Sequence, residues 1–225
     1  MAASTSGRSE PLRLHVGCGS TVVPGWVNLD KSPNVYLSRI PLLRGALARA
    51  RVLTPEQASA VFPRGIVRAD VRKGLPYGDG SVAYVYSSHL IEHLARWQAA
   101  SFVRECRRVL APGGVLRIAT PDLADIVRGY TSGERGDSPT PADRLMDQLL
   151  TFQEHPGSRA QRLIRRIATA PHQWLYDAES LAALLEEGGF VEARTRAYRE
   201  GELPDLDLLE QRSDSLIVEA RRPER

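Results

Sequence analysis

The stretch that decides the fold is Leu14-His15-Val16-Gly17-Cys18-Gly19-Ser20, near the start of a 225-residue chain. It closes an apolar run that begins at Leu12, and its two glycines stand one residue apart. A second apolar pair, Val27 and Leu29, follows and ends at Asp30. This order indicates a strand, a glycine turn, a helix, a second strand and an acidic residue.

Such an order is typical of a doubly wound α/β protein that binds an adenosine-type cofactor. Gly17 and Gly19 allow the backbone to approach a ligand at positions where a Cβ atom would clash. Asp30, at the end of the second strand, can accept hydrogen bonds from both hydroxyls of a ribose. A plain turn role at a strand end is the alternative for Asp30, as it is for Asp70 later in the chain, and the glycine turn upstream favours the ligand role.

Length and composition indicate one globular domain, because 42% hydrophobic and 25% charged residues are ordinary values for such a domain. No apolar stretch is long enough to span a bilayer. Residues 1–10 are small and polar and lack the apolar core of a signal peptide, so we expect a disordered lead-in. The two cysteines, Cys18 and Cys106, suggest no disulfide framework, which favours the cytoplasm. No basic stripe with interleaved aromatic residues is present, so a nucleic-acid partner is not expected.

Strand and helix patterns alternate after Asp30. The expected strands are 65–69, 81–87 and 115–119, and the expected helices are 94–110 and 177–187. The last two strands, 191–198 and 215–220, are linked too briefly for a crossover helix, so they should pair antiparallel. The expected fold is a Rossmann-like, doubly wound α/β domain. Its sheet has seven strands, mostly parallel with a C-terminal antiparallel pair, and helices on both faces.

Two segments do not follow this alternation of strands and helices. Residues 35–53 carry apolar residues at helical spacing, interrupted by Pro41, which suggests a break or a fresh helix start. That segment could cover a cofactor or a substrate. Residues 131–171 open with Gly, Ser and Pro and then turn helical, and segments of this length usually form a lid or a binding element. We therefore expect a single domain over 11–225 with a lid-like insertion at about 131–171.

The ordered motifs resemble class I S-adenosylmethionine-dependent methyltransferases, most closely their type 11 branch. The matching pieces are Leu14–Gly19, Trp26–Asp30, Ala69–Val71, Leu75–Tyr77, Ser87–Leu94, Glu105–Gly114 and Leu184–Phe190. The resemblance implies a methyltransferase with S-adenosyl-L-methionine as cofactor. It also implies a small-molecule acceptor, through an oxygen of a sugar, glycolipid or secondary metabolite, and a monomer or homodimer.

Carried over residue by residue, the resemblance implies a cofactor site made of Gly17, Cys18, Gly19, Asp30, Asp70, Val71 and Ser87. The glycines would lie under the methionine part, and Asp30 would bind the ribose. Asp70 would accept from the adenine amino group, and Ser87 would line the cofactor. Cys18 has two open roles, small packing and, less commonly, a reactive thiol. His15 departs from the family, which often has an acid there.

Three residues are candidates for catalysis. His89 is the first, because it follows a strand end at the expected ligand crevice and histidine titrates near neutrality. A base of this kind suits an alcohol acceptor. His172 is the second candidate and precedes Trp174 and Tyr176. Asp122 could orient either histidine, bind substrate or cap the next helix.

Two other functional classes stay open at this stage. His89, Glu92 and His93 spell H-x-x-E-H, which on a helix is an inverted zinc-protease signature. A zinc hydrolase using His89 and His93 is therefore one alternative. The surrounding motifs instead favour structural roles for Glu92 and His93, bonded to the neighbouring turn, so no metal site is expected. A non-catalytic protein on the same scaffold is the other alternative, and the retained glycines and acids argue against it.

Overall fold

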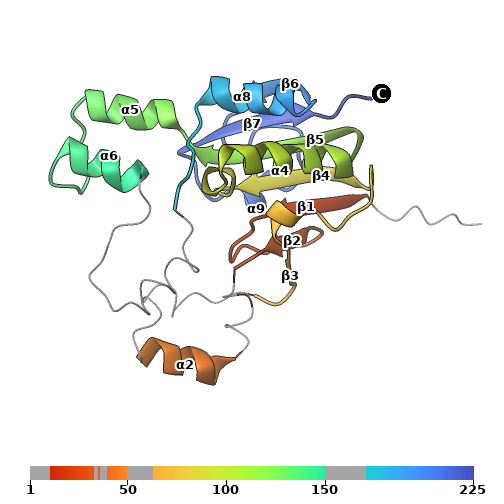
Figure 1. Cartoon of the computed structure of the whole chain (residues 1–225), viewed down its shortest axis with the longest axis horizontal. Coiled ribbons are helices and arrows are strands. Elements are labelled where there is room, and N and C mark those ends of the chain that lie inside the picture. The colour runs from red at the N-terminus through yellow and green to blue at the C-terminus, as the bar shows by residue number, and fades with distance from the viewer. Residues whose placement is uncertain (1–10, 33–34, 36–39, 50–62, 150–170) are drawn as a thin grey trace, which may run out of the picture.

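The computed structural model describes residues 11–32, 35, 40–49, 63–149 and 171–225. The expectations for 1–10, for parts of 35–53 and for most of the second half of 131–171 lie outside the described residues. Figure 1 shows a twisted sheet with two helices, α4 and α8, lying along it. The strands are β1 (Leu12–Val16), β2 (Val27–Asp30), β3 (Ile66–Arg68), β4 (Val82–Ser88), β5 (Leu110–Pro121), β6 (Val191–Thr195) and β7 (Ser215–Arg221).

The sheet has seven strands in the order β3-β2-β1-β4-β5-β7-β6. Strands β1 to β5 are parallel, and β7 runs antiparallel to β5 and to β6. The predicted fold class and the antiparallel pairing of the last two strands are thus confirmed. The helices are α2 (Pro41–Arg49), α4 (Arg96–Val109), α5 (Leu123–Thr131), α6 (Pro141–Leu149), α8 (Ala178–Glu187) and α9 (Leu206–Leu209), with 3-10 turns η1 (Val71–Lys73) and η2 (Ile91–His93).

Helices α4 and α8 cover one face of the sheet and share its main apolar core. The buried residues of α4 include Phe102, Val103 and Cys106, which recur at the spacing of one helical face. Helix α8 starts where the sequence predicts, because Asp177 accepts a hydrogen bond from the Ser180 amide at 2.9 Å. Helix α2 begins at Pro41, as a fresh start at that proline predicts.

The helix expected between the glycine turn and β2 is wrong. Residues 17–26 form turns without a helix. Pro24 removes a backbone donor, Gly25 takes φ +77°, and the segment is too short to recover another helical turn. Asn28 on β2 holds this turn instead. Its amide donates to the carbonyls of Val23 and Trp26 at 3.1 and 2.9 Å, and its oxygen accepts from the Val23 amide at 3.0 Å.

The second face of the sheet is covered mainly by the link between β6 and β7, in which α9 is the only described helix. Its leucines pack with the turn before β2 in a cluster made of Val23, Trp26, Tyr86, Val115, Leu203, Leu206 and Leu209. Arg117 on β5 is fully buried and holds this link in place through its ion pairs and hydrogen bonds. Its guanidinium lies 2.6 Å from the Glu210 carboxylate and 3.0 Å from that of Glu219. It also donates to the carbonyls of Ala197 and Glu200.

Replacing Arg117 with leucine is expected to lower the free energy of unfolding by about 3–5 kcal/mol, because two carboxylates would stay buried without their cation. Urea unfolding followed by circular dichroism measures the loss. The control is the triple variant Arg117→Leu/Glu210→Gln/Glu219→Gln, which should regain most of it. An equal loss in both proteins would show that packing, and not buried charge, sets the cost.

His15, on the same face of the sheet, should make the free energy of unfolding depend on pH. It is 2% exposed, and its Nδ1 lies 3.2 Å from the Asn28 oxygen. Burial lowers the pKa of His15 from 6.5 to about 4. The unfolded chain gains this proton near pH 6.5, so the free energy of unfolding should fall by about 1.4 kcal/mol per pH unit from there toward pH 4. Urea unfolding over this range tests it, and His15→Gln should show a shallower slope by that amount.

Candidate cofactor and acceptor site

The strand order reverses between β1 and β4, and in doubly wound sheets ligands bind outside the carboxyl ends of the strands at such a point. Val16, the last residue of β1, is paired with Ser87 near the end of β4. A Cβ atom built on Gly17 would lie 2.5 Å from Cδ1 of Leu90. The glycine turn therefore touches the segment that follows β4, which begins with His89.

The carboxylate of Asp30 holds the glycine turn in place. Gly17 and Gly19 take φ values of +74° and +55°, a region that favours glycine. The Gly19 amide donates to Asp30 Oδ2 at 2.9 Å, and the Ser32 amide donates to Oδ1 at 2.6 Å. A carboxylate has about four lone-pair sites, so these two bonds leave capacity to accept ligand hydroxyls.

Two observations on these residues fit a bound cofactor. A Cβ atom built on Gly19 meets no protein atom within 4 Å, so the turn borders open space at that point. The Ser87 hydroxyl is fully buried and lacks a hydrogen-bond partner, a property it shares in the described part of the chain with the hydroxyl of Tyr176. Buried hydroxyls are nearly always satisfied, so a polar ligand group beside Ser87 would account for it.

Asp70 is engaged by a neighbour that the sequence reasoning did not consider. Its carboxylate accepts from the Arg72 side chain at 2.8 and 2.5 Å and from the Arg72 amide at 3.2 Å. The Arg72 side chain lowers the pKa of Asp70 to about 2. Asp70 thereby caps η1, and Val71 behind it is buried. A role toward an adenine amino group would have to share this carboxylate with Arg72.

Cys18 is buried among Val35 and Ile66. Burial, aided by the nearby Asp30 carboxylate, raises the pKa of its thiol to about 12. A thiol with such a pKa is not ionised near neutral pH, and the thiolate is the reactive form. This environment favours the packing role over the reactive-thiol alternative.

His89 lies at the carboxyl end of β4 with both ring nitrogens engaged. Its Nδ1 lies 3.1 Å from Oε1 of Glu92, and its Nε2 lies 2.9 Å from the Ser215 hydroxyl on β7. Its backbone takes φ +49°, which is uncommon for a residue other than glycine and recurs at functional sites. His89 is a site residue that the sequence predicts, but its two contacts, with Glu92 and Ser215, are not predicted. The Ser215 contact spans 126 residues, so local sequence gave no signal for it.

Glu92 is fully buried, and its described partners are His89 and the Thr120 hydroxyl, 3.3 Å from Oε2. The side chain thus contacts β5 through Thr120, in addition to His89 in its own turn. Its backbone carbonyl has a separate role, since it accepts from the amides of Gln173 and Trp174 at 2.7 and 3.2 Å. Glu92 thus joins the segment before α8 to the end of β4.

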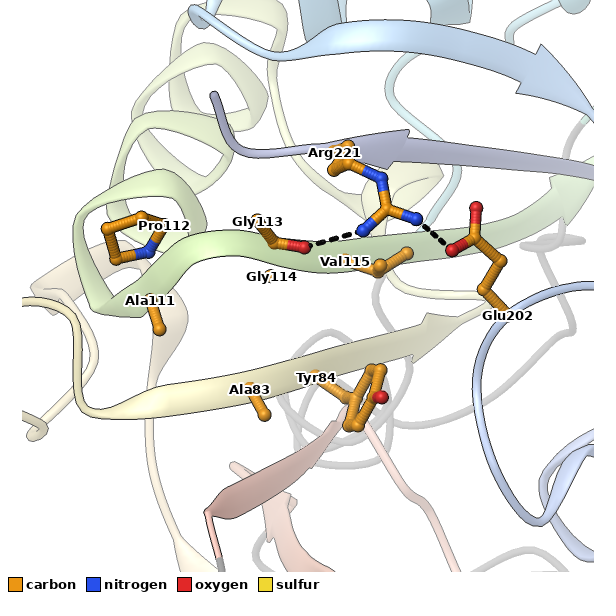
Figure 2. A pocket seen from close by; sticks show the side chains of 9 residues that line it. All are labelled: Ala83, Tyr84, Ala111, Pro112, Gly113, Gly114, Val115, Glu202 and Arg221. Carbon is orange, nitrogen blue, oxygen red and sulfur yellow. Dashed lines mark hydrogen bonds and ion pairs between the residues drawn. The ribbon is translucent and has the colours of Figure 1, made fainter. Parts of the chain in front are cut away.

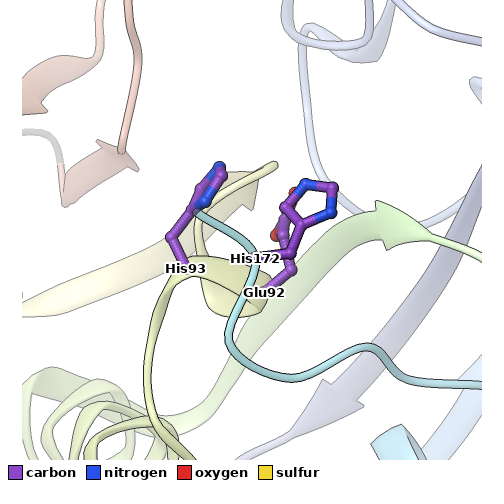
Figure 3. Close-up of side chains that lie close together, drawn as sticks. All are labelled: Glu92, His93 and His172. Atoms are coloured by element: carbon purple, nitrogen blue, oxygen red, sulfur yellow. The ribbon is translucent and has the colours of Figure 1, made fainter. Parts of the chain in front are cut away.

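His172, in that segment, lies beside His93, with ring centroids 5.0 Å apart. Figure 3 shows both rings near the Glu92 carboxylate. Burial and the neighbouring His93 lower the pKa of His172. The zinc-protease signature needs its histidines on one helix, whereas His89 follows a strand and His93 ends a three-residue 3-10 turn. The His89/His93 zinc hydrolase is therefore wrong for this geometry.

Asp122 caps α5, because its Oδ1 accepts from the Ala124 amide at 2.9 Å. This is the helix-cap alternative of the sequence reasoning. Helices α5 and α6 then project beyond the carboxyl ends of the strands (Figure 1). They pack against each other, with an ion pair between Glu134 and Arg144.

A cavity of about 180 Å³ lies at the other end of the strands (Figure 2). It is lined by the starts of β4 and β5, together with Glu202 and Arg221. Arg221 donates to the Gly113 carbonyl at 2.8 Å and pairs with Glu202. The cavity lies at the amino ends of the parallel strands, whereas the glycine turn lies at their carboxyl ends. It is therefore separate from the site where the strand order reverses.

Comparison with known proteins agrees with this arrangement. A family model described as a methyltransferase domain, of type 11, matches residues 14–118, which contain the glycine turn, Asp30, Asp70 and His89. Residues 14–118, just under half of the chain, thus resemble a class I methyltransferase domain. The cofactor of the class is S-adenosyl-L-methionine. In the described part of the chain, no helix has both the length and the apolar character needed to cross a membrane.

Curated relatives match over a short stretch. A protein of Mycolicibacterium smegmatis, named as a probable S-adenosylmethionine-dependent methyltransferase, is 49% identical over 59 residues, which is 24% of this chain and 22% of the relative. A similarly named protein of Mycobacterium tuberculosis is 44% identical over 61 residues, 27% of this chain and 22% of its own length. The match thus covers about a fifth of these relatives.

Among solved structures, an S-adenosylmethionine-dependent methyltransferase from Mesorhizobium loti is 21% identical, with 94% of this chain and 90% of that chain covered, at a TM-score of 0.47. A methyltransferase structure from Listeria monocytogenes is 12% identical, with 95% and 92% covered and a TM-score of 0.49. These scores are low, so the fold assignment rests on the strand order given above.

Gly19→Ala separates a ligand role of the glycine turn from a structural one. The added methyl group meets no protein atom, so only the φ strain of roughly 1–2 kcal/mol should reduce stability. Affinity for S-adenosylhomocysteine should fall at least about tenfold, because the methyl group would occupy the open space. Calorimetric titration and urea unfolding measure the two effects. Gly17→Ala is the contrast, since its methyl group would strike Leu90 and destabilise the fold. Parent-like affinity of Gly19→Ala would place the cofactor elsewhere.

Proposed function

We propose that this protein transfers a methyl group from S-adenosyl-L-methionine to a hydroxyl oxygen of a small molecule, with a sugar, a glycolipid or a secondary metabolite as the acceptor class. The observation that carries the proposal is the His89 ring, held by the buried Glu92 carboxylate in the segment whose Leu90 touches the glycine turn. A neutral imidazole fixed in this way is a group suited to accept a proton from a hydroxyl.

When bound, S-adenosyl-L-methionine supplies an activated methyl group, so the protein has to bind, orient and exclude water. The backbone of Gly17 and Gly19 would lie against the cofactor without Cβ atoms in the way. Asp30 would accept hydrogen bonds from the ribose hydroxyls with the lone pairs that its two amide donors leave available. Ser87 offers a buried hydroxyl that still requires a partner.

His89 acts through its Nε2 atom. Glu92 accepts a hydrogen bond from Nδ1–H, which leaves the lone pair on Nε2. That lone pair now accepts from the Ser215 hydroxyl at 2.9 Å. An acceptor hydroxyl that took the place of Ser215 would donate its hydrogen bond to Nε2. Nε2 would then hold the proton that the hydroxyl loses when the cofactor supplies its methyl group and remains as S-adenosylhomocysteine. The buried carboxylate stabilises the imidazolium that results.

The acceptor side is formed by the segment that contains His172 and Trp174. Trp174 is 44% exposed, and the Arg96 guanidinium lies 5.4 Å from its ring centroid. An exposed aromatic face beside polar groups is a common wall for a small polar ligand. Residues 131–171 are the proposed lid over this wall, within one domain that spans 11–225. We also propose that the protein acts in the cytoplasm as a monomer or a homodimer.

His89→Asn tests the base. Asparagine tolerates the positive φ at this position better than alanine, so the backbone should be kept. The kcat for methyl transfer should fall by about 10²- to 10⁴-fold, while the Kd for S-adenosyl-L-methionine should change little. Acceptors are screened with labelled cofactor, and the activity found is compared in parent and variant. Partial recovery with added imidazole would support loss of a base.

Ser215→Ala is the matched control, because it removes the other partner of the same ring without removing the base. Its kcat should stay within about threefold of the parent value. An unchanged kcat in His89→Asn would exclude His89 as the base. A loss in Ser215→Ala as large as that in His89→Asn would mean that the arrangement of the pair, and not the imidazole, is what the reaction needs.

A further inference from the structure

Glu92, His93 and His172 form a cluster at the carboxyl end of β4 that the proposed methyl transfer does not use as a unit. One nitrogen or oxygen atom from each residue lies within 4.8 Å of the other two. Figure 3 shows that the ligands come from two segments, the turn after β4 and the segment that leads to α8. Two histidines and one carboxylate are a common donor set for Zn²⁺.

The histidine rings are oriented as metal ligands usually are. Nδ1 of His93 lies 3.3 Å from the Pro171 carbonyl oxygen, and Nδ1 of His172 lies 3.1 Å from that of Gln148. A carbonyl oxygen can only accept, so each bond places the ring proton on Nδ1 and the lone pair on Nε2. Metal-bound histidines almost always donate their second ring N–H to such a partner, which fixes the ring and its tautomer.

The carboxylate supplies the charge that the site needs. Glu92 is 0% exposed, and buried carboxylates are normally paired with a cation or bound to a metal. The described partners of its side chain are the His89 ring and the Thr120 hydroxyl. Neither brings a fixed positive charge. Both would remain as the hydrogen-bonded outer contacts that ligating carboxylates usually have.

We infer that Glu92, His93 and His172 bind one divalent transition-metal ion of the Zn²⁺ class. Ligand atoms around a tetrahedral Zn²⁺ lie roughly 3.3–3.6 Å apart, so the widest separation must close by about 1.3 Å, which small side-chain rotations can provide. The ion would tie the segment that begins at Pro171 to the end of β4. Its fourth position would be left for water or for an oxygen of a substrate.

Metal binding by the whole protein, without an affinity tag and stripped with a chelator, tests this inference and requires no enzyme activity. Equilibrium dialysis with Zn²⁺ should give one ion per chain with a Kd of about 1 µM or tighter. Co²⁺ in place of Zn²⁺ should give the intense visible bands of a four-coordinate ion. The result therefore stands or falls separately from the proposed methyl transfer.

His93→Asn and His172→Asn should each weaken Zn²⁺ binding by more than the roughly 10- to 100-fold that loss of an outer contact costs. His15→Gln is the matched control, since His15 is buried against Asn28 and belongs to no such cluster; it should bind like the parent. In the parent, Zn²⁺ should shift the ring nitrogen resonances of His93 and His172 and leave those of His15 in place. This measurement does not depend on any variant folding.

Three results would overturn the inference. The first is a parent protein that retains well under one Zn²⁺ ion per chain. The second is parent-like binding in both His93→Asn and His172→Asn. The third is a Zn²⁺-bound parent in which the resonances of these two rings do not move.

Discussion

The end of the sheet is organised by one buried carboxylate. Glu92 connects three parts of the chain that are distant in sequence, namely the end of β4, the end of β5 through Thr120, and the segment before α8 through its backbone carbonyl. Burying an ionised group is costly unless every lone pair is used. The described hydrogen bonds of the Glu92 side chain, to His89 and Thr120, offset part of this cost, and they fix His89 at the place where the strand order reverses.

The two sides of the site differ in what they are made of. The β1–β2 side is built largely from backbone, because Gly19, bonded to Asp30, borders open space, while Gly17 lies against the Leu90 side chain. The β4–β5 side is built from side chains that can move or hold protons. In the proposed reaction, the methyl donor would lie on the first surface and the hydroxyl acceptor on the second. The two would meet at the ends of β1 and β4, and these strands are direct neighbours.

Much of the fold follows from local sequence. Alternating apolar runs, Gly113 and Gly189 at positive φ and the Asp177 cap indicate strands and helix ends directly. The turn at 17–26 does not follow in the same way. A helix is the usual connection between parallel strands, and here Asn28 satisfies the backbone instead, from a position on the next strand. The cover of the second face also depends on non-local contacts.

The site residues also divide into those that local sequence predicts and those that it does not. Gly17, Gly19, Asp30 and His89 could be named from motifs, because each follows a strand end. Ser215 and Arg72 could not, since a serine at a strand start and an arginine in a turn are unremarkable residues. Glu92 was visible in the sequence, but its buried environment was not. His172 lies beside His93 although the two residues are far apart in the sequence, and no spacing rule predicts such a contact.

The buried Arg117 bears on how the protein reaches this state. Its partners Glu210 and Glu219 lie 93 and 102 residues further along, and β7 enters the sheet between β5 and β6. On a ribosome, β1 to β5 would emerge with a guanidinium on β5 that has no carboxylate to meet. The ion pairs of Arg117 can therefore form only after Glu210 and β7 have left the ribosome. Nascent chains of this protein should spend an interval with one sheet face bare, when a chaperone is of most use to them.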